Sequence, residues 1–341
     1  MKIIFTFIVG LLLSSSIGQA QNTNAAVDYL DKMGAEFKAI QVATWDYTKA
    51  AANNRNARKI DKKRLELIQQ IDASTKNVNR LTAFNKKTYL KDSVLSFLRM
   101  QKIVIQEDYG KIMDLEDIAE SSYDAMEAYI AAKQIASDKL EISSQRVSDT
   151  YNAFAKENNI TITEGEKDKI SQQLLIADEV YAHYNEVYLI FFKPYKQELY
   201  VLDAMNKGDL AAMEQNKVSL SKVSAESQAK LKAVKPFRGS DNSIRAAATE
   251  LINFYKDEAD NKFAKLIDFY AKKDAFDKGK KAFETNKNKT NDDINAYNKL
   301  IDEFNKASND FNNTNSELNK KRNALLNNWN NASQNFTAKY L

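Results

Sequence analysis

Apolar residues recur at every third or fourth position along most of the chain, which is the spacing of one face of an α-helix. Leu30, Met33, Phe37 and Ile40 begin this pattern. In the first half of the chain it predicts helical segments over about 24–52, 56–82, 87–130 and 136–157. In the second half it predicts segments over about 170–202, 209–234, 243–285 and 294–336. We therefore expect a chain built of long helices.

The last of these segments has the most regular pattern. Its apolar positions follow a heptad repeat from Ile294 through Trp329 to Phe336. A seam of this kind packs against other helices and can also support self-association. Asn315 and Arg322 interrupt the seam, and these interruptions favour packing within the chain. The sequence leaves the oligomeric state open.

Glycine and proline are scarce, which limits the number of tight turns. The 341 residues include 8 Gly and 2 Pro, whereas ordinary proteins contain about 7% and 5% of these residues. A chain with few turns has long elements, and we expect an all-α fold of long helices in two tandem antiparallel, coiled-coil-like helical bundles. The chain has no cysteine, so packing and not disulfides must stabilise it.

Short sequences in the first half return in the second half. Tyr109–Asp114 resembles Phe263–Asp268 at an offset of 154 residues, and Asp149–Asn152 resembles Asp302–Asn305 at an offset of 153. Repeats at a constant offset are typical of duplicated structural units. We interpret them as an internal duplication, in which each half of the chain closes its own helical core.

The polar segment 158–164 is the best candidate for a linker between the two halves. We accordingly expect an N-terminal bundle over 21–160 and a C-terminal bundle over 165–341. The first twenty residues have a different pattern: Lys2 is followed by an apolar run and then by Gly18-Gln19-Ala20. This order predicts a signal peptide over 1–20 that is cleaved after Ala20. The later apolar runs are short, so we expect no transmembrane span in the mature chain.

Charge and residue inventory exclude several classes of function. The formal net charge is only +4, and a nucleic-acid binder needs a concentrated basic field. The densest basic cluster, between Arg55 and Arg64, has no interleaved aromatic residues that would stack on bases. With one histidine, no cysteine and no glycine-rich phosphate loop, the usual catalytic groups are missing. We therefore predict no enzymatic activity and no cofactor.

Two features of the second half are weak candidates for a binding site. His183 and Glu186 lie three residues apart, which places them on one helix face as a possible metal pair. This His-Tyr-Asn-Glu stretch resembles the histidine–glutamate motif of the imelysin family, although the glycine that this family has two residues earlier is Tyr181 here. Near Pro194, where we expect a helix kink, Tyr184, Tyr188 and Tyr195 belong to an aromatic-rich stretch that could contact a ligand.

Three longer segments resemble a family of uncharacterised bacterial surface proteins. They are Glu107–Glu116, Ser122–Tyr129 and Val187–Glu198. The resemblance implies an exported, helical envelope protein and transfers no functional residue. We therefore expect a non-enzymatic protein of the periplasm or cell surface that binds a protein, polymer or lipid partner through extended helical faces. The alternative is a periplasmic protein that binds a metal or small ligand at His183 and Glu186.

Overall fold

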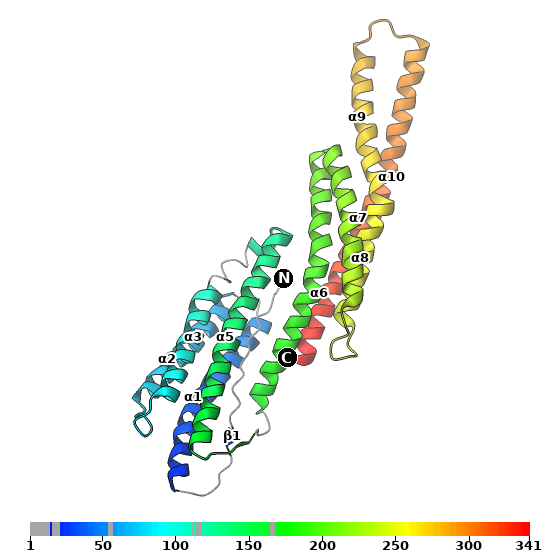
Figure 1. The fold of residues 1–341 in the computed structure, drawn as a ribbon. Helices are drawn as coiled ribbons and strands as arrows, with labels where there is room; N and C mark the ends of the chain where they lie inside the picture. The colour runs from blue at the N-terminus through cyan, green and yellow to red at the C-terminus, as the bar shows by residue number, and fades with distance from the viewer. Residues whose placement is uncertain (1–13, 16–20, 54–56, 111, 113–117, 164–167) are drawn as a thin grey trace. The chain divides into compact units, whose positions relative to one another are not determined.

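The computed structural model describes residues 14–15, 21–53, 57–110, 112, 118–163 and 168–341. The described residues confirm the predicted all-α class, since helices account for nearly all of them (Figure 1). The N-terminal helices are α1 (Gln21–Asn53), α2 (Ala57–Arg80), α3 (Tyr89–Ile103), the π-helical turn η1 (Val104–Asp108) and α5 (Tyr123–Glu157). The later helices are α6 (Lys169–Lys207), α7 (Leu210–Ala233), α8 (Ser243–Asp257), the π-helical turn η2 (Glu258–Lys262), α9 (Phe263–Thr285) and α10 (Asn291–Tyr340).

Two short strands form a small sheet. The strand β1 (Ser14–Ser15) pairs antiparallel with β2 (Ile162–Thr163). The predicted signal peptide, 1–20, otherwise lies outside the described residues. Within the described part of the chain, no helix has the length and apolar character needed to cross a membrane.

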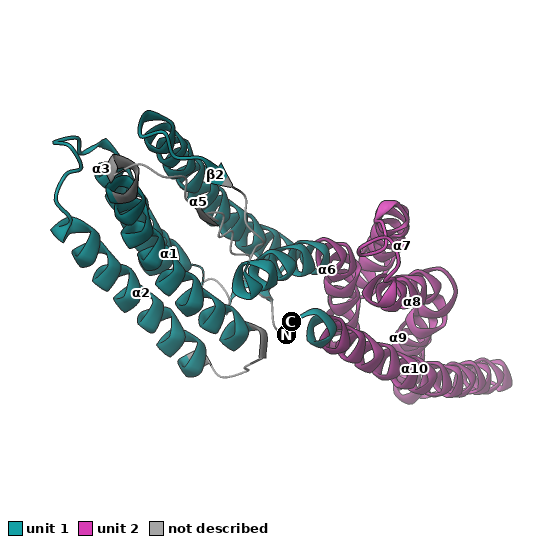
Figure 2. Cartoon of the chain, turned by 90° about the horizontal axis from the view of Figure 1, so that it is seen from below, with its two compact units in different colours: residues 1–185, 337–341 teal, residues 186–336 magenta. Residues whose placement is uncertain are grey.

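The chain forms two compact units, shown in different colours in Figure 2. Unit 1 contains residues 1–185 and 337–341, and unit 2 contains residues 186–336. The division falls inside the continuous helix α6, whereas the linker expected at 158–164 lies earlier, around the end of α5 and strand β2. A loop-like sequence therefore does not mark the place where the packing changes.

The same order of elements occurs in both units. Helices α2 and α7 each have 24 residues, α3 and α8 each have 15, and η1 and η2 each have 5. The loop before α3 contains a β-bridge from Phe84 to Lys87, and the loop before α8 contains one from Phe237 to Asp241. These elements recur at the offset of 153 or 154 residues that the sequence repeats show.

The last helices do not follow this offset. Phe154 of α5 packs edge-on against Phe84, and Phe336 of α10 packs in the same way against Phe237. These contacts make α5 equivalent to the C-terminal part of α10. The matched sequences Asp149–Asn152 and Asp302–Asn305 therefore occupy different places in the two units.

Several predicted boundaries agree with the structure, and two do not. Asp209 caps α7 as its position suggests, since its side chain accepts a hydrogen bond of 3.0 Å from the backbone N–H of Ala212. Helix α5 begins at Tyr123 and not near 136, because the Ser122 side chain caps it. The helix predicted over 243–285 is divided by η2, since a π-turn inserts one residue without interrupting the apolar pattern.

Candidate functional site

A buried ionic cluster lies inside unit 2. The guanidinium of Arg322 donates one hydrogen bond to Oε1 of Glu198 and another, of 2.5 Å, to Oε1 of Glu258. Its third nitrogen donates to Oδ1 of Asn319 at 2.5 Å. Both glutamates are 0% exposed and Arg322 is 8% exposed. Charged residues are almost never this deeply buried unless they are paired. Glu198, Glu258 and Arg322 therefore form one ionic cluster, here called the buried triad.

Three helical elements bring the buried triad together. Glu198 lies on α6, Glu258 is the first residue of η2, and Arg322 occupies a seam position of α10. The partners of Arg322 are 124 and 64 residues away along the sequence. Arg322 thus interrupts the heptad at the place where α10 is bonded to two other elements of unit 2. This contact agrees with the packing within the chain that the interruption favours.

The electrostatics of the buried triad are unbalanced, because two carboxyl groups meet one guanidinium. Burial and the neighbouring Glu198 carboxyl raise the pKa of Glu258 well above its usual range. Burial lowers the pKa of Arg322, but Glu198 and Glu258 more than offset this effect and the net shift is upward. Burial, assisted by the same two carboxyl groups, also raises the pKa of Tyr255. Both directions follow from the same imbalance, since the two carboxyl groups favour the charged form of Arg322 and disfavour a second negative charge beside them.

Three buried oxygens of this region have no hydrogen-bond donor or acceptor among the protein atoms. They are Oε2 of Glu198, Oε2 of Glu258 and the hydroxyl of Tyr255. Unpaired buried polar atoms cost about 1–3 kcal/mol each, so they call for an explanation in a natural protein.

Aromatic side chains pack beside the buried triad, and two of the predicted ligand-binding tyrosines are among them. Tyr188 is 0% exposed and stacks on Trp329 of α10 with ring centroids 6.4 Å apart. Tyr195 is half-buried and contacts Phe191, whose ring lies 4.8 Å from Trp329. Tyr184 is buried on α6 within unit 1. The structure thus brings Tyr188 and Tyr195 into one packed aromatic core.

The metal pair suggested by the sequence lies on α6. His183 is half-buried, whereas Glu186 is exposed. Among the described residues there is no group of three or more His, Cys, Asp or Glu residues placed to hold a metal ion. The structure adds no further ligand to His183 and Glu186, so this reading stays a prediction.

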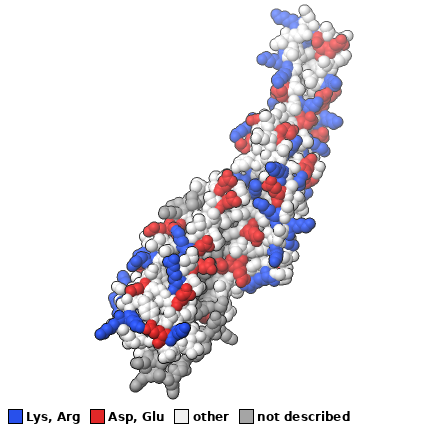
Figure 3. Space-filling model, viewed as in Figure 1, with Lys and Arg blue, Asp and Glu red and all other residues white. Residues whose placement is uncertain are grey.

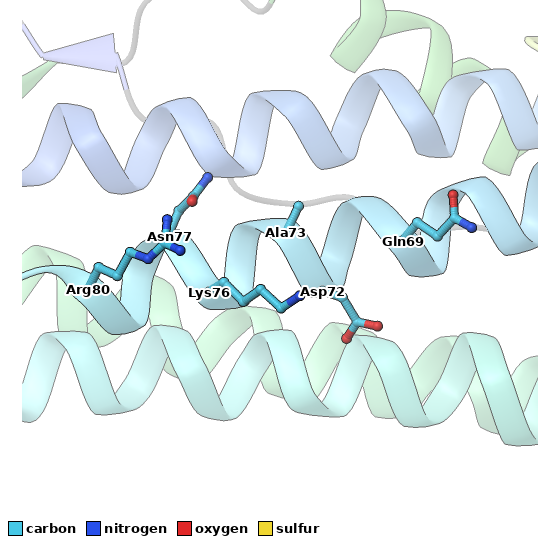
Figure 4. Close-up of a pocket in the computed structure, with 6 residues that line it drawn as sticks. All are labelled: Gln69, Asp72, Ala73, Lys76, Asn77 and Arg80. Carbon is cyan, nitrogen blue, oxygen red and sulfur yellow. The ribbon is translucent and has the colours of Figure 1, made fainter.

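A shallow groove on α2 offers little chemistry. It encloses about 410 Å³, and all of the residues that line it lie on this single helix (Figure 4). Its Asp72 already accepts a hydrogen bond of 2.7 Å from Lys102, and its Asn77 donates one of 3.0 Å to Glu36. Because these polar groups are engaged and the groove is open, it does not resemble a built ligand site.

An exposed aromatic seam lies on the hairpin formed by α9 and α10. We call residues 268–306 the hairpin arm; within it, every residue is exposed or half-buried. The two helices touch through stacked rings, with Phe283 and Tyr297 4.3 Å apart and Phe276 and Phe304 4.7 Å apart. A side chain at Gly279 would overlap Leu300, so the glycine allows the helices to approach closely.

The hairpin arm is therefore a pair of helices whose apolar seam is covered only by the contact between α9 and α10. Each ring of the seam is shielded by the opposite helix and remains partly open to solvent. Elsewhere α10 buries its seam, as Ala307, Leu318, Trp329 and Phe336 show. The contrast identifies the arm as a region of unit 2 where the described residues leave a continuous apolar seam partly exposed.

Basic and acidic side chains are interspersed along the arm, as the face shown in Figure 3 illustrates. Lys272 and Glu303 form an ion pair of 2.7 Å across the two helices. The sequence could have indicated this surface, since the heptad of the last helix begins well before its buried part.

Comparison with known proteins adds no relative: no family model matches the chain, and no curated protein or solved structure is detectably similar to it.

Proposed function

We propose that this chain is an exported, non-enzymatic protein of the bacterial envelope or cell surface, and that it binds a helical segment of a protein partner along the hairpin arm. One observation carries the proposal. The arm has no buried residue from 268 to 306, although both of its helices carry a regular apolar seam. A seam of this kind is completed when further helices pack against it.

The half-buried aromatic rings define the face that would be covered. Phe269, Phe276 and Phe283 lie along α9, and Tyr297 and Phe304 face them from α10. Aromatic residues dominate the energetics of many protein interfaces because they bury much area with little loss of side-chain entropy. An amphipathic partner helix that lay along this row would remove the remaining exposed ring surface from water.

The charge distribution favours a protein partner over a lipid or a polyanion. Helices that lie on anionic membranes have a polar face rich in Lys and Arg. On the arm, basic residues alternate with acids such as Glu284, Asp292 and Asp293. A mixed-charge rim instead suits another mixed-charge helix, where it selects orientation and partner. The same mixture disfavours nucleic acid.

Export is the second part of the proposal. It is supported by the charged, apolar and small-residue order of the first twenty residues. The resemblance to the family of bacterial surface proteins points the same way. Protease treatment of intact cells, with a known periplasmic protein as control, distinguishes the cell surface from the periplasm: cleavage of this chain alone places it outside.

Site-specific photo-crosslinking tests the binding surface. A photoreactive residue is placed at position 276 or 283 of the arm and, as control, at Ile142 of α5, which is 57% exposed in unit 1. We expect adducts from the two arm positions and none from position 142. The double variant Phe276→Ser, Phe283→Ser should abolish binding of the crosslinked partner while the helical content is retained.

Two outcomes would overturn the assignment. One is that position 142 gives the same adducts as the arm positions. The other is that the double serine variant binds the partner as well as the unchanged chain does. The mass of the adduct identifies the occupant, and a mass of twice the chain would replace the foreign partner with a second copy.

A further inference from the structure

The buried triad has one negative charge too many for a dry protein interior. If both carboxyl groups were ionised, Glu198, Glu258 and Arg322 together would carry a net charge of −1 at 0–8% exposure. An uncompensated buried charge is so costly that the group usually changes its protonation state instead. Among the residues that the structure describes, Arg322 is the basic side chain that donates hydrogen bonds to these two glutamates.

The geometry shows where a compensating proton would sit. Each glutamate gives its Oε1 to Arg322, and each keeps an Oε2 that accepts from no other donor. The two side chains also lie within hydrogen-bonding reach of each other. Two carboxylates cannot hydrogen-bond to each other, because neither has a donor; a carboxylic acid and a carboxylate can.

We propose that Glu198 and Glu258 hold one proton between their Oε2 atoms in the folded protein at neutral pH, so that the buried triad is a proton-binding site in the core of unit 2. The proton comes from solvent, and whichever carboxyl group carries it donates a hydrogen bond to the other. One added hydrogen gives both oxygens a partner and brings the cluster to zero net charge. This inference is independent of the proposed binding function.

The groups around the site favour a proton over a metal ion. The site is formed by Glu198 from α6, Glu258 from η2, and Arg322 and Asn319 from α10. Tyr255 of α8 interacts electrostatically with both carboxyl groups, with Arg322 and with Tyr195 of α6. The guanidinium already occupies one oxygen of each carboxyl group, and its positive charge repels a second cation. A proton is the smallest cation that can bind, and it needs no additional ligands.

The bound proton couples the packing of α10 to pH. Arg322 joins α10 to both α6 and η2. Loss of the proton leaves two carboxylates facing each other in the core. We therefore expect alkaline pH to loosen α10 around Trp329, which lies two turns further along the same helix.

Infrared spectroscopy of the full-length mature protein tests the site directly. A protonated carboxyl group has a C=O stretching band that a carboxylate lacks. We expect this band in the unchanged protein at pH 8, and we expect it to disappear in both Glu258→Gln and Glu198→Gln. The control is Glu317→Gln, which changes an exposed glutamate of α10 that pairs with Lys262 at 3.3 Å and should leave the band intact.

The proposal is overturned if the unchanged protein has no protonated carboxyl group at pH 8, or if the band survives both glutamine substitutions. Because the first measurement uses the unchanged protein, it remains decisive even when a variant fails to fold. Titration of the δ-carbons of isotope-labelled glutamate by NMR gives a second measurement. One resonance should stay in the protonated position at pH 8, and its absence would also contradict the site.

Discussion

Unit 1 and unit 2 have similar helices but differently built cores. Val104 and Glu258 are the first residues of the two π-turns, and Thr44 and Glu198 stand equally far before the ends of α1 and α6. The third pair is Leu140 and Arg322, which stand equally far before the equivalent Phe154 and Phe336. Unit 1 thus has Thr44, Val104 and Leu140, all buried, at the positions where unit 2 has its buried triad.

This comparison shows that the ionic cluster is not required by the architecture. Unit 1 has the same order of helices with one hydroxyl and two aliphatic side chains at these positions. The hydroxyl of Thr44 donates a hydrogen bond of 2.8 Å to the carbonyl of Ile40. Buried ion pairs rarely add stability relative to apolar residues of similar volume. The triad is therefore better explained by a specific role in unit 2 than by stability.

The largest expected effect comes from breaking the cluster on one side. Arg322→Met removes the positive charge of the buried triad, leaves the shared carboxylate charge uncompensated, and should reduce the free energy of unfolding of unit 2 by about 3–5 kcal/mol. Chemical denaturation measures it through the fluorescence of Trp329 in a Trp45→Phe background, because each unit contains one tryptophan. The matched change in unit 1, Leu140→Met, should cost less than about 1.5 kcal/mol. Equal costs would remove the distinction between the two cores.

Converting one core into the other should have the opposite sign. The triple variant Glu198→Thr, Glu258→Val, Arg322→Leu gives unit 2 the residues of unit 1. We expect it to fold with a stability that is unchanged or raised by about 1–4 kcal/mol, because no charge is left to desolvate. The same denaturation experiment checks it. A loss comparable to that of Arg322→Met would show that the cluster does stabilise the fold.

The pH dependence of the two units should also differ. The folded protein raises the pKa of Glu258 above its ordinary value of 4.5, so the native state binds more protons than the unfolded state. Unit 2 should lose stability as pH rises from about 4.5 to the raised pKa, by at most about 1.4 kcal/mol per pH unit. Glu258→Gln should flatten this profile.

Unit 1 supplies the contrast for that measurement. Burial, and then the neighbouring Glu141 and Glu179, raise the pKa of Asp178 to about 6. The contribution of Asp178 to the stability of unit 1 is therefore lost between about pH 3.8 and pH 6, and it does not change further above that range. Between pH 7 and 9, Trp329 should report a falling stability and Trp45 a constant one. Parallel profiles would contradict the assignment of the effect to the buried triad.

A smaller effect is expected from a buried hydrogen bond in the core of unit 1. In unit 1 the hydroxyl of Tyr151 donates a hydrogen bond of 2.6 Å to the carbonyl of Leu30 and lies 4.0 Å from where Gly34 would carry a side chain. Tyr151→Phe should cost about 1 kcal/mol, since a buried hydrogen bond is lost. The control Tyr123→Phe removes an exposed bond to Glu127 and should cost less than about 0.5 kcal/mol.

The sequence predicts the helices far better than it predicts the cluster. Periodicity alone locates α10 and its seam, and scarcity of glycine and proline indicates the helical class. At Arg322 the same periodicity shows only a fault in the heptad, because the partners that explain the fault are 124 and 64 residues away. Glu198 and Glu258 are two acids among 46 and have no local signature. Ser122, by contrast, is a residue type that favours the N-cap position, and the sequence could therefore have indicated that α5 begins at Tyr123.

The π-turn η2 has a consequence for the direction of the hairpin arm. A π-turn accommodates one residue more than an α-helical turn, so the helix beyond it keeps nearly the facing that an uninterrupted α-helix would have. Deleting one residue between Glu258 and Lys262 should therefore leave Phe276 and Phe283 facing Tyr297, whereas deleting one residue of α9 before Phe276 would turn both rings away by about a quarter of a turn. The five residues of η2 thus keep the apolar faces of α8 and α9 in line, and with them the side from which a partner can approach the hairpin arm.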